Sequence, residues 1–321
     1  MMKGVIVGAG FMGRTHLEAY ASRKDAEIVC IVDRDEQKAK ALTQAYGIEA
    51  LAELSRALEE WKIDFVDVCL PSTLHRQAAI TALEAGAHVL VEKPFALSLE
   101  DADAMIEAAD KARRRLMVAH VCRFMPQYQY LKQTVATERL GKSLIFSAWR
   151  LSETPGWSWN NWLNDKSLSG GTLLDLSIHD LDIANWLFGT PVEHRLKEIA
   201  SPLKTGPSHL ISSLGYPGIG AVTIEASHLM PAGYPFSAGF RLVTERGSLE
   251  WGTSAAQPGC LGEFTDQGER QIEIKEEDPY RREIQHFLDC LRTGKAFAIS
   301  PREARLAVRT VAMLQNPDGC C

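Results

Sequence analysis

Short apolar runs alternate with helix-like segments along the first 120 residues of the chain. The apolar runs predict strands at 3–7, 28–32, 65–70, 88–91 and 116–119. The segments between them predict helices at 11–22, 37–46, 73–85 and 98–113, with Gly47 and Gly86 as stops and Ser98 as an N-cap. Continuous apolar strands separated by helices are typical of a parallel sheet covered on both faces.

Beyond Arg123 the pattern changes to longer, more alternating segments. These predict strands at 143–150, 209–214, 221–228, 240–243 and 271–274. Helical spacing predicts helices at 126–136, 174–187, 280–291 and 301–315, the last with Ser300 as N-cap. Grouped strands with a few helices favour an α+β domain that has a large, mainly antiparallel sheet.

A glycine-rich loop follows the first predicted strand and opens the first predicted helix. Its sequence Gly8-Ala9-Gly10-Phe11-Met12-Gly13 fits the GxGxxG pattern of dinucleotide-binding loops. Gly8 allows the tight turn, Gly10 lets the backbone approach a pyrophosphate, and Gly13 lets helix and strand pack closely. The alternative is a glycine-rich turn that binds nothing.

An acidic residue supports the nucleotide interpretation. Asp33 ends the next strand, 20 residues after Gly13, where a carboxylate can accept the ribose 2′-hydroxyl. Arg34, beside it, could instead hold a 2′-phosphate. The pair favours NAD, with NADP as the open alternative. The sequence therefore predicts a doubly wound parallel Rossmann domain over 1–121 and an α+β substrate-binding and oligomerisation domain over 122–321.

Composition and charge exclude several other classes. The 321 residues are 45% hydrophobic and 24% charged, with a net charge of -6, so neither nucleic acid nor a membrane is indicated as a partner. The seven cysteines show no CxxC and no metal-ligand spacing. This pattern predicts a reducing cytoplasm, no disulfide framework and no metal.

Two clusters carry candidate chemistry. Glu92-Lys93-Pro94 ends a predicted parallel strand, at the sheet edge where ligands bind in such folds. Lys93 could give or take a proton there, or it could be a solvated turn residue.

The second cluster lies on one predicted helix. Asp175, His179 and Asp182 are spaced four and three apart, on one face of that helix, after the pair Gly170-Gly171. A carboxylate and an imidazole in this arrangement suit proton transfer. A capped helix with a structural acid–histidine hydrogen bond is the alternative.

These motifs together resemble the Gfo/Idh/MocA oxidoreductase family over essentially the whole chain. GAGFMG resembles its dinucleotide loop, Glu92-Lys93-Pro94 its EKP motif, and the stretch from Gly170 to Asp182 its GG-xxx-D-xxx-H-xx-D motif. The stretch 69–75, Arg123-Phe124 and the late helix with Tyr280, Glu283 and Phe287 also fit. Ser169 and Cys122 depart from the pattern, and Cys122 puts a substrate contact there in doubt.

The resemblance implies roles for individual residues. Lys93 and His179 would be the catalytic pair, with Asp175 orienting the substrate. The residues implied to bind cofactor are Gly8, Gly10, Phe11, Met12, Gly13, Asp33, Arg34, Pro71, Ser72, His75, Glu92 and Lys93. The residues implied to bind substrate are Lys93, Trp162, Asp175, His179 and Tyr280.

Some features permit only weaker expectations. Trp157, Trp159 and Trp162 could stack on a polyol ring or simply order a loop. His16 is expected to lie on a helix face. No pattern suggests a metal at the other histidines, which are His88, His120, His194, His209, His228 and His286.

The leading functional hypothesis is an NAD(P)-dependent dehydrogenase or reductase acting on a secondary alcohol or ketone. Its substrate would be a sugar, cyclitol or nucleotide-sugar, and the protein would form a homodimer or homotetramer. The alternatives are other redox-assisted chemistry on the same fold, such as glycosidic cleavage or imine or enone reduction, and a non-catalytic nucleotide sensor. Substrate, direction, the first proton acceptor and the role of Cys320 and Cys321 stay open.

Overall fold

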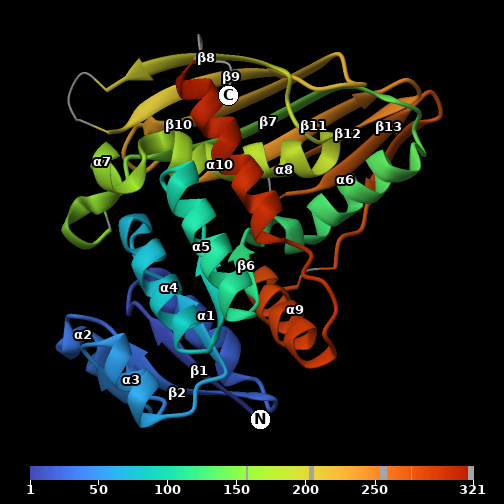
Figure 1. Ribbon diagram of the computed structural model, residues 1–321. Coiled ribbons are helices and arrows are strands. Elements are labelled where there is room, and N and C mark those ends of the chain that lie inside the picture. The colour runs from blue at the N-terminus through green and yellow to red at the C-terminus, as the bar shows by residue number, and fades with distance from the viewer. Residues whose placement is uncertain (157, 202–205, 254–258, 276, 317–321) are drawn as a thin grey trace. The chain divides into compact units, whose positions relative to one another are not determined.

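The computed structural model describes residues 1–156, 158–201, 206–253, 259–275 and 277–316, and of Trp159 only the backbone. The chain divides into two compact units (Figure 1). The first comprises Met1–Val121 and Asp278–Arg305, and the second comprises Cys122–Glu277 and the chain from Leu306. The late helix that carries Tyr280 therefore groups with the first unit, whereas the sequence division counted it with the second.

The first unit is built on a six-stranded sheet in which every pair of neighbouring strands is parallel. The strand order is β3-β2-β1-β4-β5-β6, which is the doubly wound Rossmann order and confirms the prediction. The strands are β1 (Met2–Val7), β2 (Ala26–Val32), β3 (Glu49–Leu51), β4 (Phe65–Val68), β5 (His88–Glu92) and β6 (Leu116–Ala119). The three-residue β3 was missed from sequence because it is too short to show a pattern.

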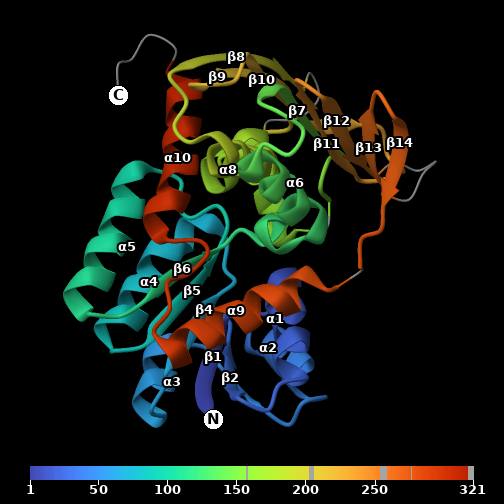
Figure 2. The same cartoon turned by 90° about the vertical axis from the view of Figure 1, so that its right-hand side faces the viewer.

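Helices cover both faces of this sheet. They are α1 (Phe11–Ala21), α2 (Glu36–Thr43), α3 (Leu54–Glu60), α4 (His75–Glu84), α5 (Leu99–Ala112) and α9 (Pro279–Thr293). Figure 2 shows α4 and α5 on one side of the sheet and α1 with α9 on the other. Ser98 caps α5 as predicted, because its hydroxyl accepts the Asp101 N–H at 3.1 Å.

The second unit contains an eight-stranded sheet in the order β14-β13-β12-β11-β7-β10-β9-β8. Among its described strands only β7 and β10 pair in parallel, so the mainly antiparallel prediction is confirmed. The strands are β7 (Ser143–Glu153), β8 (Glu193–Ala200), β9 (Ser208–Gly215), β10 (Ala221–Met230), β11 (Ser237–Thr244), β12 (Gly247–Gly252), β13 (Leu261–Thr265) and β14 (Gly268–Ile272). The strands β8, β12 and β13 were missed, and β14 lies nearer the N-terminus than the predicted 271–274.

The two faces of this sheet differ. One face presents fully buried side chains such as Phe146, Ile224 and Phe240, against which α6 (Pro126–Thr137) and α8 (Ile178–Phe188) pack (Figures 1 and 2). No helix among the described residues of this unit covers the other face. There Ile145 and Ile211 are 45% and 47% exposed.

The predicted helix at 174–187 is not uniformly α-helical. It begins as a π-helical turn, Leu173–Ser177, and only then continues as α8. π-Turns of this kind occur frequently at functional sites. The predicted helix at 301–315 is present as α10 (Pro301–Gln315), and Ser300 caps it because its hydroxyl accepts the Glu303 N–H at 3.2 Å. None of the described helices is long and apolar enough to cross a bilayer.

Candidate active site

The glycine loop of the first unit forms a backbone surface that a side chain would block. Gly8 has φ +110°, and a Cβ there would lie 2.4 Å from the Cys69 carbonyl oxygen. A Cβ on Gly13 would lie 1.8 Å from the Gly8 oxygen, so helix and strand pack closely as predicted. Among the described residues, a Cβ on Gly10 would approach the Lys38 Nζ at 3.9 Å and no other atom beyond its chain neighbours and its own helix within 4 Å. The loop is therefore open above Gly10, which fits a pyrophosphate.

The start of α1 adds a favourable field to this surface. Its N-cap is Gly10, and no side chain hydrogen-bonds to the cap. The positive end of the helix dipole can therefore face a phosphate. Phe11 is exposed and Met12 is half-buried in the same turn.

Asp33 lies at the end of β2, beside the loop. Its Oδ2 accepts the Ala9 N–H at 2.8 Å, and its Oδ1 accepts the Asp35 N–H at 3.0 Å. The Lys38 Nζ lies 3.8 Å from Oδ2, while Arg34 is exposed. The sequence analysis did not identify Lys38, because no local pattern shows that α2 brings its side chain close to Asp33.

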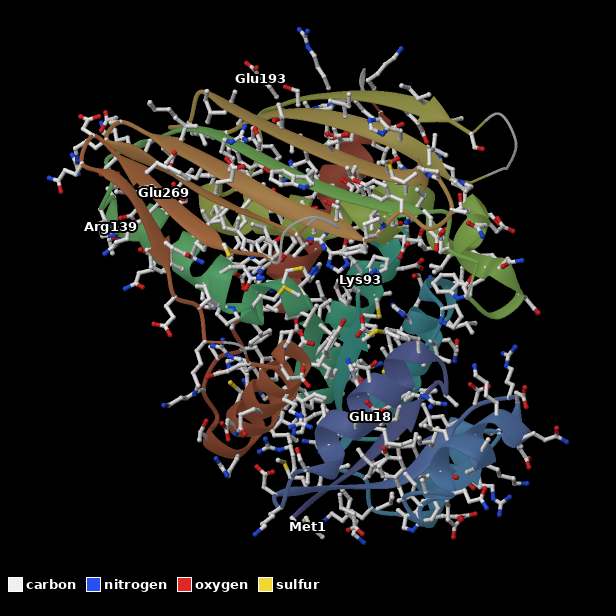
Figure 3. The ribbon with its side chains drawn as sticks, turned by 180° about the vertical axis from the view of Figure 1, so that it is seen from behind. Met1, Glu18, Lys93, Arg139, Glu193 and Glu269 are labelled. Carbon is white, nitrogen blue, oxygen red and sulfur yellow. The ribbon has the colours of Figure 1, made fainter. Side chains whose placement is uncertain are left out.

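The EKP turn is fixed from two sides. At the end of β5, Glu92 Oε2 accepts the Lys93 N–H at 3.0 Å (Lys93 is labelled in Figure 3). Both ring nitrogens of the buried His75 face backbone oxygens, those of Pro94 at 3.0 Å and Leu70 at 2.9 Å. The stretch that contains Pro71, Ser72 and His75 is thereby tied to the Lys93-Pro94 turn.

A buried polar cluster lies on the α1 side of the same sheet. His16 lies in α1, as expected, and its side chain is fully buried. Its Nδ1 lies 2.8 Å from Asp67 Oδ2 and 3.5 Å from Cys69 Sγ, and its Nε2 lies 3.1 Å from Glu92 Oε1. Burial, the largest single influence, lowers the pKa of His16, but Asp67 and Cys69 together raise this pKa well above its ordinary value.

Two residues of α9 approach this cluster. The ring centroids of Tyr280 and His16 are 6.1 Å apart. Glu283 is fully buried, and neither of its carboxyl oxygens has a hydrogen-bond partner among the described residues. Burial, with help from the nearby Glu92 carboxylate, raises the pKa of Glu283 well above its usual range.

In the second unit, the glycine pair starts the helix that carries Asp175 and His179. Gly170 has φ +77°, and a Cβ there would lie 2.4 Å from the Leu174 side chain. The buried Ser169 hydroxyl donates to backbone oxygens and accepts the Gly171 N–H at 3.0 Å. A serine therefore fits at this position of the motif, although it departs from the family pattern.

Solvent access separates Asp175 and His179 from their neighbours. Every other residue from 171 to 185 is buried, whereas these two side chains are partly exposed. The buried Asp182 has a structural role, since both of its carboxylate oxygens accept hydrogen bonds from Arg123, at 2.7 and 2.8 Å. Of the three residues predicted to lie on one helix face, two are therefore accessible and the third forms a buried ion pair.

Each accessible group has one contact that sequence reasoning missed. His179 Nδ1 lies 3.6 Å from Cys122 Sγ. Asp175 Oδ2 lies 3.5 Å from Nε2 of the buried His228, whose Nδ1 in turn lies 3.4 Å from Thr172 Oγ1. Both partners are about 55 residues away in sequence, and no local signal marks them.

Of the tryptophans, Trp162 lies half-buried in the turn Trp159–Asn164. Trp157 lies outside the described residues, and so does the side chain of Trp159.

Comparison with known proteins agrees with the fold and the loop. Residues 2–120 match the family model of the Gfo/Idh/MocA oxidoreductases with an NAD-binding Rossmann fold, and residues 128–250 match the C-terminal domain of the same family. The chain therefore belongs to the Gfo/Idh/MocA family, and NAD is its cofactor. The open loop above Gly10 and the adjacent Asp33 fit that nucleotide.

Two relatives and one solved structure illustrate the match. The chain is 33% identical over 198 residues to D-apiose dehydrogenase of Paraburkholderia graminis, covering 58% of this chain but only 50% of that protein. It is 27% identical over 314 residues to scyllo-inositol 2-dehydrogenase (NAD(+)) of Bacillus subtilis, covering 94% of this chain and 89% of that one. An oxidoreductase from Agrobacterium radiobacter, solved with NAD+, L-tartaric acid and magnesium, has a similar fold, with a TM-score of 0.87 at 21% identity over 98% of this chain and 95% of that one.

Proposed function

We propose that the protein is an NAD-linked dehydrogenase that oxidises a secondary alcohol of a sugar, cyclitol or nucleotide-sugar, or reduces the corresponding ketone. The relatives support this class, because their names describe dehydrogenases of a sugar and of an inositol. The observation that carries the proposal is that Asp175 and His179 alone reach solvent in an otherwise buried stretch. A buried helix start has no structural need for an accessible acid and imidazole.

We assign the nucleotide to the first unit. Gly8, Gly10, Phe11, Met12 and Gly13 would surround its pyrophosphate. Asp33 would accept a ribose hydroxyl, with Arg34 and Lys38 near the 2′ position. Pro71, Ser72, His75 and the Glu92-Lys93 turn would complete its binding site. Bound NAD supplies the carbon that accepts or returns a hydride.

The chain's own residues handle the proton. We assign the proton acceptor to His179 Nε2, because Nδ1 faces Cys122 and a proton held there leaves the Nε2 lone pair basic. Asp175, held by His228, would orient a substrate hydroxyl. Lys93 would polarise or protonate the same oxygen, and the motif resemblance supports its pairing with His179. Trp162 and Tyr280 are further candidates for substrate contact.

A substrate panel tests this function. Sugars, inositols and UDP-sugars are offered with NAD and with NADP, and reduced nicotinamide is followed by absorbance. We expect NAD reduction with at least one polyol, and its loss in His179→Ala. Tight NAD binding without turnover on any member, in either direction, would favour a nucleotide sensor instead.

We also propose that the open face of the second unit's sheet joins copies of the chain. The register places Ile145, Ile199 and Ile211 on that face, 45%, 51% and 47% exposed. Exposed isoleucines on a sheet are a liability unless they are paired. Light scattering should therefore give a dimer or tetramer, which Ile211→Glu dissociates. A single-chain mass for the unmodified protein would contradict this proposal.

A cytoplasmic location fits the cysteines. The described cysteines at 30, 69, 122, 260 and 290 are all free thiols. Free thiols persist in a reducing compartment, and we propose that the protein works in one.

A further inference from the structure

We infer that His16, on the helix that follows the dinucleotide loop, is a positioning residue for Lys93 and acts through Glu92. This inference rests on the proposed role of Lys93. No part of the sequence pattern assigned His16 a task, yet it is fully buried and contacts charged groups at both ring nitrogens.

The chain of contacts runs from β4 to the EKP turn. Asp67 Oδ2 lies 2.8 Å from His16 Nδ1, which fixes the plane of the ring. Nε2 then faces Glu92 Oε1 at 3.1 Å, an electrostatic contact rather than an aligned hydrogen bond. The second oxygen of Glu92 accepts the backbone N–H of Lys93 at 3.0 Å. The imidazole thus positions the Glu92 carboxylate, and this carboxylate in turn positions the backbone at the start of the Lys93 turn.

Charged and titratable groups surround the His16 ring. Facing it are Asp67 and Cys69 from β4 and its end, Glu92 from β5, Tyr280 and Glu283 from α9, and Tyr20 from its own helix. Two of these, Asp67 and Glu92, are buried carboxylates that need a cation between them. Cys69 stays a neutral thiol because burial raises its pKa well above the ordinary value. The imidazolium is therefore the group that compensates both carboxylates.

If the group that faces Glu92 from the Nε2 position is lost, Glu92 loses its contact with His16 and keeps those with the Lys93 N–H and the Lys93 charge. We expect its carboxyl to rotate, and the Lys93 N–H then loses a fixed acceptor. A displacement of about 1 Å at a reacting group can cost about a hundredfold in rate. Lys93 would therefore lose its placement although its own side chain is intact.

Two isosteric variants separate the two contacts. His16→Asn places a donor where Nδ1 lies and keeps the bond to Asp67, whereas His16→Gln places a donor where Nε2 lies and keeps the contact to Glu92. Both remove the charge equally, and they differ in which of the two carboxylates they still reach. We expect His16→Asn to lower kcat about a hundredfold on the polyol found for the wild type, and His16→Gln to restore most of it. The NAD Kd from calorimetry should change less than about threefold in both.

A second readout does not depend on turnover. With ¹⁵N-lysine labelling, the Lys93 amide, assigned from Lys93→Arg, should shift in His16→Asn and stay near its wild-type position in His16→Gln. Thermal unfolding ensures that both variants are compared in the folded state. Equal kcat values for the two variants, or an unmoved Lys93 amide in His16→Asn, would overturn the inference.

The controls distinguish this failure from failure of the proposed function. If Lys93→Ala keeps the wild-type kcat, or no polyol is turned over, the role of Lys93 is wrong, and the amide shift alone still decides whether His16 positions the turn. Metal analysis tests the alternative that His16 binds a metal. His16, Asp67 and Cys69 offer donor atoms within 4.8 Å of one another. Stoichiometric zinc, lost in both His16 variants, would make His16 a metal ligand and would contradict the positioning role.

Discussion

Two glycine turns, each followed by a helix, serve different purposes in this chain. In the first, a Cβ on Gly10 would meet nothing nearer than the Lys38 Nζ at 3.9 Å, so the backbone is bare toward solvent. In the second, a Cβ on Gly170 would collide with Leu174 at 2.4 Å, because the Leu174 side chain fills the space where the Cβ would lie. The first turn keeps room for a ligand, whereas the second uses its glycine for packing.

This contrast also separates the expected site of nucleotide binding from that of proton transfer. The first turn can recognise a nucleotide through backbone groups and a helix dipole, which need no special side chain. The packed second turn fixes the helix on which Asp175 and His179 stand. Binding and proton transfer should therefore respond to different substitutions.

The largest expected effect is on proton transfer. His179→Ala and Lys93→Ala should each lower kcat by about 10²–10⁴-fold, because a positioned acid–base group is lost. NAD affinity, measured by calorimetry, should stay nearly unchanged. Lys111→Ala, at an exposed position of α5, is the matched control and should behave as wild type. Near wild-type kcat in either active-site variant would remove that residue from the mechanism.

The next effect sharpens the contrast at the first turn. Gly10→Ala should weaken NAD binding about a hundredfold, about 2.8 kcal/mol, while the melting temperature stays unchanged. Its new methyl group would occupy the space proposed for the pyrophosphate and would meet the Lys38 Nζ at an ordinary contact distance of 3.9 Å. Gly13→Ala is the counterpart and should lower the melting temperature, because its Cβ would lie 1.8 Å from the Gly8 oxygen. Unimpaired NAD binding by Gly10→Ala would show that the loop surface is not the pyrophosphate site.

At the second turn we expect a loss of stability instead. Gly170→Ala should cost about 2 kcal/mol or more in urea unfolding, from a left-handed backbone and an overpacked Leu174. Gly189→Ala isolates the backbone part, because Gly189 has φ +91° and no atom of the described residues beyond its chain neighbours lies within 4 Å of where a Cβ would stand. Equal losses in the two variants would mean that packing against Leu174 contributes nothing.

The smallest effect concerns the choice of nucleotide. Asp33→Ala should weaken NAD about tenfold, since a hydrogen bond to a charged group contributes about 1.5–3 kcal/mol at most. NADP should lose less, because the same change removes repulsion of the 2′-phosphate. Parallel titrations with both nucleotides measure the difference, and equal losses would refute the assigned role of Asp33.

Features that depend on neighbouring residues were predictable from the sequence. The glycine loop, Asp33 and the caps Ser98 and Ser300 have their determinants within one turn or one strand. The parallel sheet followed from apolar runs that are buried on both faces. The strands that escaped prediction, such as β3 and β8, are short or mostly exposed and show no apolar face.

Features that depend on distant partners were not predictable. His16 meets Asp67 across 51 residues of sequence, and His179 meets Cys122 across 57. Whether such a histidine is buried depends on which carboxylate or thiol the fold brings to it, because an unpaired polar group is costly to bury. The π-turn at Leu173–Ser177 likewise depends on packing that the hydrophobic periodicity of the sequence does not reveal.

The buried Glu283 makes folding of this protein a proton-uptake reaction. Burial raises the pKa of Glu283 well above its ordinary value of 4.5, so above that pH the unfolded chain releases a proton that the folded chain retains. The unfolded state then binds fewer protons, and the stability contributed by this group declines as pH rises from 4.5 toward the folded pKa. Unfolding enthalpies compared in buffers of different ionisation heat should show that Glu283→Gln releases fewer protons than the wild type between pH 4.5 and the folded pKa of Glu283. Over the same range, the stability of the variant relative to wild type should grow with pH.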